Sequence, residues 1–262
     1  MNTFKVNGIH VNDHGGKGEP LIFIHAYPLC SRMWDKQAEY FNDRFRVITY
    51  DIRGLGYSNE LESYLFTMED LVDDLENILN HMKLDKVNAC GLSVGGYILL
   101  RSAERMPERF SSLILADTKA ESDDHDSMLN RSAGIKKIRS GMKDEFIEAM
   151  LPKLISNEGF NNPEINNKVR EMMGWMDVNG MCSVMIAIAT RTNLINRLKN
   201  ISIPSLVIVG KEDALTPVIH SFYLKENLRN AKYHLIKNAG HISNMEKPEE
   251  FNKALEEFLL SV

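Results

Sequence analysis

The sequence predicts an α/β protein built on a mostly parallel, doubly wound sheet with a helical insertion. Short unbroken apolar runs recur along the chain, and this pattern is typical of strands that are buried on both faces of a parallel sheet. Amphipathic helical patterns with clear start signals separate these runs. The alternation stops between residues 119 and 199, where only helical patterns occur. Regular alternation of strands and helices predicts a sheet covered by helices on both faces.

The chain opens with a predicted β-hairpin. Two strand-like runs, 4–6 and 8–11, flank Asn7-Gly8, a dipeptide favoured in two-residue hairpin turns. Further strands are expected at residues 20–25, 45–50, 87–91, 113–116, 205–209 and, more weakly, 233–236. These runs lack the alternation of apolar and polar residues that a strand with one solvated face would show.

Helix start signals fall between the predicted strands. Thr67 and Asp70 form a capping box in front of an apolar stripe with helical spacing. Pro217, behind a Thr216 cap, and Pro248 each stand where the first helical residue is expected, a position at which proline costs no hydrogen bond. Helices are therefore expected after residue 67, after residue 217 and from residue 248 to the end of the chain.

Residues 119–199 are predicted to form a helical cap over a core made of residues 1–118 and 200–262. Helical stretches are expected near 143–155, 163–176 and 178–190. Eight of the 14 methionines lie in this segment, and they either fill helix interfaces or line an adaptable apolar pocket. The acidic run at 121–126 is expected to be a solvated loop.

Composition narrows the function. The net charge of −5 and the absence of a Lys/Arg cluster give no electrostatic basis for binding nucleic acid or anionic lipid. The three cysteines form no CxxC pair and show no metal-ligand spacing, which favours a reduced compartment. Neither a signal peptide nor an apolar stretch of membrane-spanning length is found. We expect a cytoplasmic protein that acts on a small molecule, without a metal or organic cofactor and without a nucleic-acid or membrane partner.

The strongest local signal is Gly91-Leu-Ser-Val-Gly95, which follows a predicted strand and precedes a helical pattern. This context is that of a nucleophile elbow, in which flanking glycines let strand and helix approach while Ser93 projects from a strained turn. A serine hydroxyl is a weak nucleophile, so it needs a base and an acid that orients the base.

The candidate base is His241, which follows the last predicted strand, where a loop would hold it at the carboxyl edge of the sheet. The candidate acid is Asp213, just beyond the strand that ends at residue 209. Glu212 and Asp117 are rival acids, and Asp117 also ends a strand. The remaining requirement is an oxyanion hole, for which we expect the backbone amides of Val94 and Tyr27.

His25, next to Tyr27 in that loop, is expected to be structural and to bond the loop backbone. Side chains of four further residues are expected in the substrate pocket: Met150, Trp175, Leu215 and Ile242.

Several of these segments match one family in order and spacing across nearly the whole chain. They are His25-Ala-Tyr-Pro-Leu29, Asp51 to Ser58, Gly91 to Gly96, Gly210 to Pro217 and Gly240-His241. The sequence thus resembles the α/β-hydrolase superfamily. Within it, the sequence is most similar to the branch of small-ester hydrolases that includes 3-oxoadipate enol-lactonase-like enzymes and cofactor-free haloperoxidases (perhydrolases). The resemblance implies the α/β-hydrolase fold and a Ser-Asp-His order of the triad. Ala26 departs from the family's usual glycine, and a positive φ there would strain the loop.

These observations together predict a serine carboxylesterase or lactonase. Ser93 would form an acyl-enzyme with a small to medium, mostly apolar ester or lactone, since nothing in the sequence resembles an Arg-rich site for a dianion. The alternatives are an enol-lactonase-type lactonase, a cofactor-free perhydrolase and, outside enzymes, a small-ligand receptor on a hydrolase fold.

Overall fold

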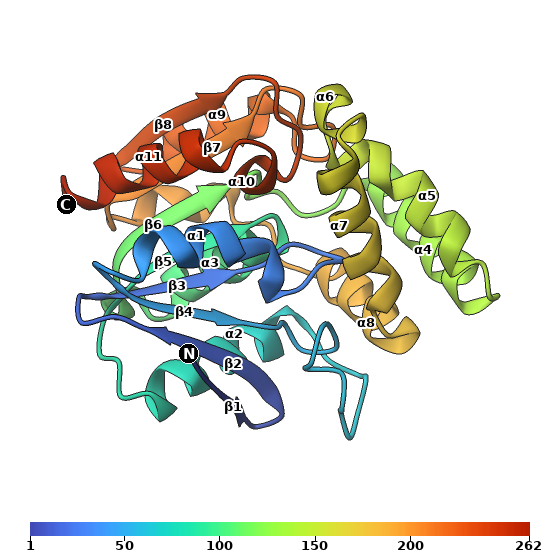
Figure 1. The fold of residues 1–262 in the computed structure, drawn as a ribbon, viewed down its shortest axis with the longest axis horizontal. Coiled ribbons are helices and arrows are strands. Elements are labelled where there is room, and N and C mark those ends of the chain that lie inside the picture. The colour runs from blue at the N-terminus through green and yellow to red at the C-terminus, as the bar shows by residue number, and fades with distance from the viewer.

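The computed structural model describes residues 1–262 and contains one eight-stranded sheet with helices on both faces and a further group of helices beyond one edge (Figure 1). The strands are β1 (Asn2–Val6), β2 (Ile9–Gly15), β3 (Pro20–Ile24), β4 (Arg46–Tyr50), β5 (Val87–Leu92), β6 (Phe110–Ala116), β7 (Ser205–Gly210) and β8 (Ala231–Ile236). Their order is β1-β2-β4-β3-β5-β6-β7-β8, with β1 and β2 antiparallel to their neighbours and the others parallel. Every predicted strand is present, with shifts only at its ends.

The opening hairpin forms as predicted. Val6 pairs with Ile9, so Asn7 and Gly8 are the two residues of the turn. Both have positive φ, 50° and 85°, as the favoured two-residue hairpin turn requires.

The sheet order reverses at β3, which lies between β4 and β5. Ile24 at the end of β3 pairs with Gly91 near the end of β5, so the loops that follow these strands leave the sheet side by side. Open α/β sheets bind their ligands at such a point, outside the carboxyl ends of the strands.

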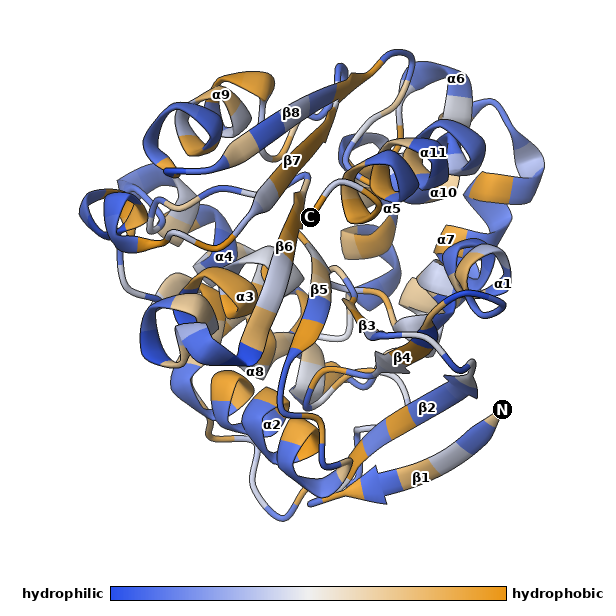
Figure 2. Cartoon of the chain, turned by 90° about the vertical axis from the view of Figure 1, so that its left-hand side faces the viewer, coloured by the Kyte–Doolittle hydropathy of each residue, from blue (hydrophilic) through white to orange (hydrophobic).

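Helices cover the two faces of the sheet in the view of Figure 2, with α2, α3 and α9 on one side and α1 and α11 on the other. Their bounds are α1 (Asp35–Phe41), α2 (Met68–His81), α3 (Val94–Arg105), α9 (Val218–Asn227), α10 (Ser243–Glu246) and α11 (Pro248–Leu259). Short 3₁₀ helices span Ser31–Trp34, Pro107–Arg109 and Ile195–Asn200. The capping box is confirmed, because Asp70 accepts hydrogen bonds from both the N–H and the hydroxyl of Thr67 at 2.7 Å.

The prediction that Thr216 is the N-cap of α9 was wrong. Pro217 itself is the N-cap residue, and the Thr216 hydroxyl donates to Asp213 instead.

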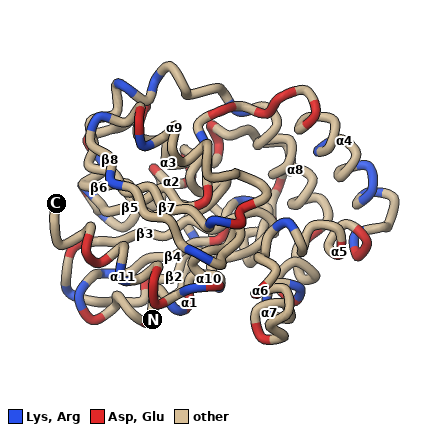
Figure 3. Tube along the Cα trace, turned by 90° about the horizontal axis from the view of Figure 1, so that it is seen from above, with Lys and Arg blue, Asp and Glu red and all other residues tan.

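Charged residues of both signs are interspersed along the trace (Figure 3).

The insertion between β6 and β7 is helical. It consists of α4 (His125–Arg139), α5 (Lys143–Leu154), α6 (Asn157–Phe160), α7 (Pro163–Trp175) and α8 (Val178–Ala189). Three of these helices match the prediction, whereas α4 and α6 were missed. Helix α4 lacks a regular apolar stripe, since only Gly134 and Ile138 on it are buried. No single helix is long and apolar enough to cross a membrane; α7 and α8 would qualify only as a pair, and they are bent by 98°.

The acidic run before α4 is only partly the solvated loop that the sequence suggested, since Asp124 and Asp126 are exposed but Asp123 is not. Asp123 is buried and forms ion pairs with two arginines, Arg131 on α4 and Arg191 after α8. Asp124 caps α4 by accepting a 2.8 Å hydrogen bond from the N–H of Ser127. Two arginines that come from different segments neutralise Asp123, a pairing that no local pattern could reveal.

Candidate active site

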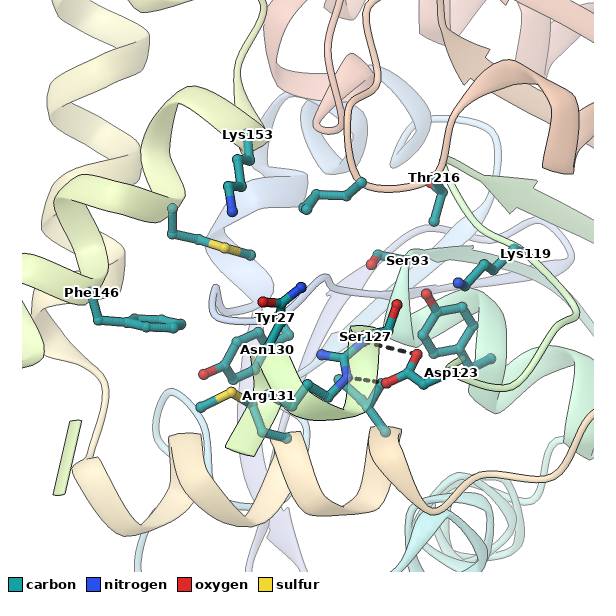
Figure 4. Close-up of a pocket in the computed structure, with 15 residues that line it drawn as sticks. Tyr27, Ser93, Lys119, Asp123, Ser127, Asn130, Arg131, Phe146, Lys153 and Thr216 are labelled. Atoms are coloured by element: carbon teal, nitrogen blue, oxygen red, sulfur yellow. Dashed lines mark hydrogen bonds and ion pairs between the residues drawn. The ribbon is translucent and has the colours of Figure 1, made fainter. Parts of the chain in front are cut away.

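Ser93 occupies a strained turn between β5 and α3, with φ 55° and ψ −112°. A side chain on either flanking glycine would collide with backbone. A Cβ on Gly95 would lie 2.3 Å from the carbonyl oxygen of Ile24, and one on Gly91 would lie 2.4 Å from the carbonyl of Gly95. Strand and helix therefore approach as closely as the elbow motif predicts, and the Ser93 side chain lines a pocket at the sheet edge (Figure 4).

Asp213 and His241 come together although 28 residues separate them. They follow β7 and β8, and the ring Nδ1 of His241 lies 2.9 Å from both carboxylate oxygens of Asp213. The carboxylate also accepts hydrogen bonds from the N–H groups of Leu215 and Thr216 and from the Thr216 hydroxyl, at 2.7 to 2.9 Å. Burial raises the pKa of Asp213, but the charge and hydrogen bond of His241 together with the Thr216 bonds outweigh it, so the pKa is lowered. Asp213 is thus a stable anion that holds a proton on Nδ1 and leaves Nε2 free.

Neither rival acid forms a hydrogen bond with His241. Asp117 accepts a 2.8 Å hydrogen bond from the N–H of Gly210 and a second one from the Ser243 hydroxyl. Burial and the nearby charge of Asp213 raise the pKa of Asp117 well above its ordinary value. Glu212 instead accepts a hydrogen bond from the N–H of Asn157.

Ser93 and His241 share no hydrogen bond in this structure. Such bonds are often long in unliganded sites and shorten when substrate binds.

The two expected oxyanion donors belong to the segments that follow β3 and β5. Val94 is the first residue of α3, whose first-turn N–H groups have no partner within the helix. Tyr27 lies in the loop after β3, and its side chain lines the same pocket. Ala26 is not among the residues with positive φ, so alanine is compatible with this loop.

His25 is structural, as expected. Its Nδ1 lies 2.9 Å from the Ala26 carbonyl, and its Nε2 accepts a 2.8 Å hydrogen bond from the N–H of Ile52. Burial lowers the pKa of His25, which keeps the ring neutral as these two bonds require.

The pocket has a volume of about 240 Å³, which is small beside the roughly 300–1,000 Å³ of sites for drug-sized ligands. Met150 and Leu215, two of the four residues expected in the substrate pocket, line it. Trp175 and Ile242 do not. Trp175 is 40% exposed at the end of α7 and packs edge-on against Tyr57, with ring centroids 4.5 Å apart. Ile242, directly after His241, is fully buried.

The methionines of the insertion divide between the two roles that the sequence left open. Met150 and Met185 line the pocket. Four are buried in the core, namely Met172, Met173, Met176 and Met181, and Met128 and Met142 are exposed.

The sequence did not predict the charged side chains of the pocket. Lys119, Arg131 and Lys153 line it together with Asp123 and Tyr97, beside seven hydrophobic residues. These residues come from the loop after β6 and from α3, α4 and α5, and no motif joins them in the sequence.

The fold and the arrangement at this sheet edge define the protein as a hydrolase on an α/β sheet. A family model described as alpha/beta hydrolase fold matches residues 19–157, and the chain belongs to this family. It is 31% identical to 3-oxoadipate enol-lactonase 2 of Acinetobacter baylyi over 90% of this chain and 86% of that one.

Among solved structures, the chain is similar to a thermophilic esterase from Thermogutta terrifontis in a malate-bound form. The TM-score is 0.93 and the identity 32%, over 100% of this chain and 99% of that one. It is also similar to the enol-lactonase from Burkholderia xenovorans LB400, with a TM-score of 0.90 and 26% identity over 99% and 100% of the two chains.

Proposed function

We propose that this hydrolase cleaves small carboxylic esters or lactones through an acyl-enzyme on Ser93. The observation that carries the proposal is the buried Asp213–His241 pair, which lies at the same sheet edge as a serine held in a strained elbow. His241 Nε2 takes the proton of the Ser93 hydroxyl as the oxygen attacks the carbonyl carbon. The protonated ring then gives this proton to the leaving alkoxide, and Asp213 stabilises the imidazolium between the two steps.

Water completes the reaction. His241 removes a proton from a water molecule that attacks the acyl carbon, and the proton returns to Ser93 as the acid leaves. In each half-reaction the carbonyl oxygen becomes an anion, which the N–H groups of Tyr27 and Val94 would bind. One such donor contributes about 3 to 4 kcal/mol to the stability of the transition state. In a lactone the alkoxide stays attached to the acyl group, so the same steps open the ring.

Two further observations support this function. The small pocket limits the substrate to a short ester or lactone, and the similar proteins are named as an enol-lactonase and an esterase. Helices α4, α5 and α8 each contribute residues to the pocket wall, so we propose that residues 119–199 act as a cap whose side chains select the substrate.

The test combines turnover with labelling of the nucleophile. Wild type, Ser93→Ala and, as a matched control, Ser132→Ala on the exposed side of α4 are assayed by pH-stat with ethyl esters of increasing acyl length and with γ- and δ-lactones. We expect Ser93→Ala to lose at least about 10³-fold in kcat/KM. Paraoxon should add one diethyl phosphate to wild type and to Ser132→Ala, at Ser93, and none to Ser93→Ala. Ligand binding without turnover in the wild type would instead identify a receptor, and retained activity in Ser93→Ala would refute the mechanism.

A further inference from the structure

The pocket that contains Ser93 holds two cationic side chains without partners. Lys119 belongs to the loop after β6 and is half-buried, whereas Lys153 lies on α5 and is exposed at the rim of the pocket. Neither ammonium group forms an ion pair or a hydrogen bond within the chain, although most other charged groups near the pocket are paired. Figure 4 shows the two side chains reaching the pocket from different segments, on either side of Ser93 in that view.

The other charges of the pocket do not neutralise these lysines. Asp123 is the one carboxylate in the lining, and Arg131 and Arg191 already share it. Glu121 lies outside the lining, with its Oε1 2.9 Å from Nδ1 of His220, and it acts on Lys119 only through its charge. The lining therefore has a net charge of +2. Burial and the charge of Arg191 lower the pKa of Lys119, which shows that its surroundings disfavour an unpaired ammonium group.

We infer that the substrate carries a carboxylate besides the bond that is cleaved, and that Lys119 and Lys153 bind it. This inference rests on the proposed function. The substrate class is then a half-ester of a short dicarboxylic acid, an ester of a hydroxy acid, or a lactone with a carboxylate substituent. A neutral acyl chain of the same length would leave the half-buried ammonium group of Lys119 facing apolar atoms, so the pocket discriminates against it.

The test compares charged esters with neutral ones by pH-stat. Monoethyl glutarate carries the carboxylate on the acyl side, butyryloxyacetate carries it on the alcohol side, and ethyl valerate and ethyl butyrate are the neutral references. We expect kcat/KM for one charged ester to exceed that of its neutral reference by at least about ten-fold, the size of one charge-assisted hydrogen bond. The charged ester that exceeds its neutral reference shows whether the carboxylate of the substrate lies on the acyl side or on the alcohol side of the cleaved bond.

Lysine variants connect the preference to its cause. Lys119→Gln and Lys153→Gln should each lower the ratio of charged to neutral kcat/KM by about ten-fold, whereas Lys136→Gln on the outside of α4 should leave the ratio unchanged. Added salt should lower the ratio in the wild type and in Lys136→Gln, and lower it less in Lys119→Gln and Lys153→Gln. A wild type that hydrolyses neutral esters as well as charged ones would overturn this inference and leave the proposed function intact. A wild type that hydrolyses none of the esters or lactones would refute the function itself.

A different observation concerns Glu246, a buried carboxylate with no cationic partner that lies beside the His241 loop. It accepts a 2.7 Å hydrogen bond from the N–H of Gly240 and two more from the N–H and hydroxyl of Ser156, just after α5. The carbonyl of Leu154 in turn accepts hydrogen bonds from the N–H groups of His241 and Ile242, at 3.0 and 3.2 Å. Glu246 thus joins the end of α5 to the loop that carries the base.

We propose that Glu246 is a positioning residue, which keeps His241 in place only while the helical insertion is seated on the core. Replacing Glu246 by glutamine puts an NH₂ group against one of these N–H donors, so the loop must shift. A misplacement of about 1 Å at a reacting group costs up to roughly 100-fold in rate. We expect Glu246→Gln to lower kcat at least about ten-fold with KM nearly unchanged.

The measurement separates positioning from stability. Labelling of Ser93 by paraoxon, which also needs the base, should slow by the same factor as kcat at a temperature well below the melting point. Glu249→Gln, an exposed neighbour on α11, is the matched control and should behave as wild type. A variant that melts earlier but keeps its kcat and its labelling rate would show that Glu246 only stabilises the fold.

Discussion

Replacing Asp213 by asparagine, next to the same replacement at Asp117, tests which of two buried carboxylates orients the base. In the Asp213→Asn protein, the N–H groups of Leu215 and Thr216 both point at Oδ1, so they would keep the amide oxygen there. The amide NH₂ then takes the place of Oδ2, 2.9 Å from Nδ1 of His241. Because an N–H facing Nδ1 favours the tautomer with the proton on Nε2, the ring can no longer accept the proton of Ser93.

The expected loss follows from this geometry. A triad whose acid is replaced by its amide loses about 10⁴-fold in kcat, or about 5.5 kcal/mol of transition-state stabilisation. Asp117 should behave differently, because it forms no hydrogen bond with His241 and both of its own partners can also bind an amide. An asparagine there can accept from the N–H of Gly210 and donate to the Ser243 hydroxyl, so kcat should stay within about three-fold of wild type.

The assay is hydrolysis of the best ester found in the substrate panel, measured as kcat and KM at pH 7.5 for both variants and wild type. Circular dichroism and thermal unfolding verify that each variant is folded. Equal losses in the two variants, or a loss confined to Asp117→Asn, would refute the assignment of Asp213 as the acid.

Three further predictions concern the fold and the pocket. Gly95→Ala should destabilise the protein by about 3 kcal/mol or more by overpacking, because its Cβ would lie 2.3 Å from a backbone oxygen. Gly174→Ala, whose Cβ would lie in open space on α7, should stabilise the protein by about 0.5 to 1 kcal/mol. Urea unfolding measures both changes. Met150→Ala should change the preference for acyl length at nearly constant melting temperature. Met172→Ala should lower the free energy of unfolding by about 2 to 5 kcal/mol and leave the preference unchanged. The reverse pattern would contradict the assignment of Met150 to the substrate pocket. Asp123→Asn should cost about 3 to 5 kcal/mol near pH 7, because it leaves two arginines unpaired. The pKa of Asp123 is lowered by Arg131 and Arg191 despite its burial, so its contribution is full above the ordinary carboxyl pKa of 3.8 and is lost as the pH falls through the lower folded value. The difference in unfolding free energy between wild type and Asp123→Asn should therefore shrink below about pH 4. A difference that stays constant with pH would argue against the ion pair.

Local patterns were sufficient for most of the sheet and for the elbow. The strands, the Asn7-Gly8 turn and the capping box at Thr67 are encoded by neighbouring residues, and all three form. Helix α4 was missed because its residues present no continuous apolar stripe, and its cap depends on Asp124. Trp175 was misplaced because aromatic character says nothing about direction, and the side chain packs outward on Tyr57.

The sequence by itself determined the fold class and the positions of Ser93, Asp213 and His241 at strand ends, because hydrophobic periodicity and turn chemistry act over a few residues. Only the tertiary structure decided which carboxylate reaches His241 and which charges meet in the pocket. Lys119 and Lys153 are 34 positions apart in the sequence, and Asp123 pairs with Arg191, which is 68 positions further along the chain. Such contacts depend on how the insertion packs against the sheet edge, which is set by the burial of many side chains at once rather than by any local pattern.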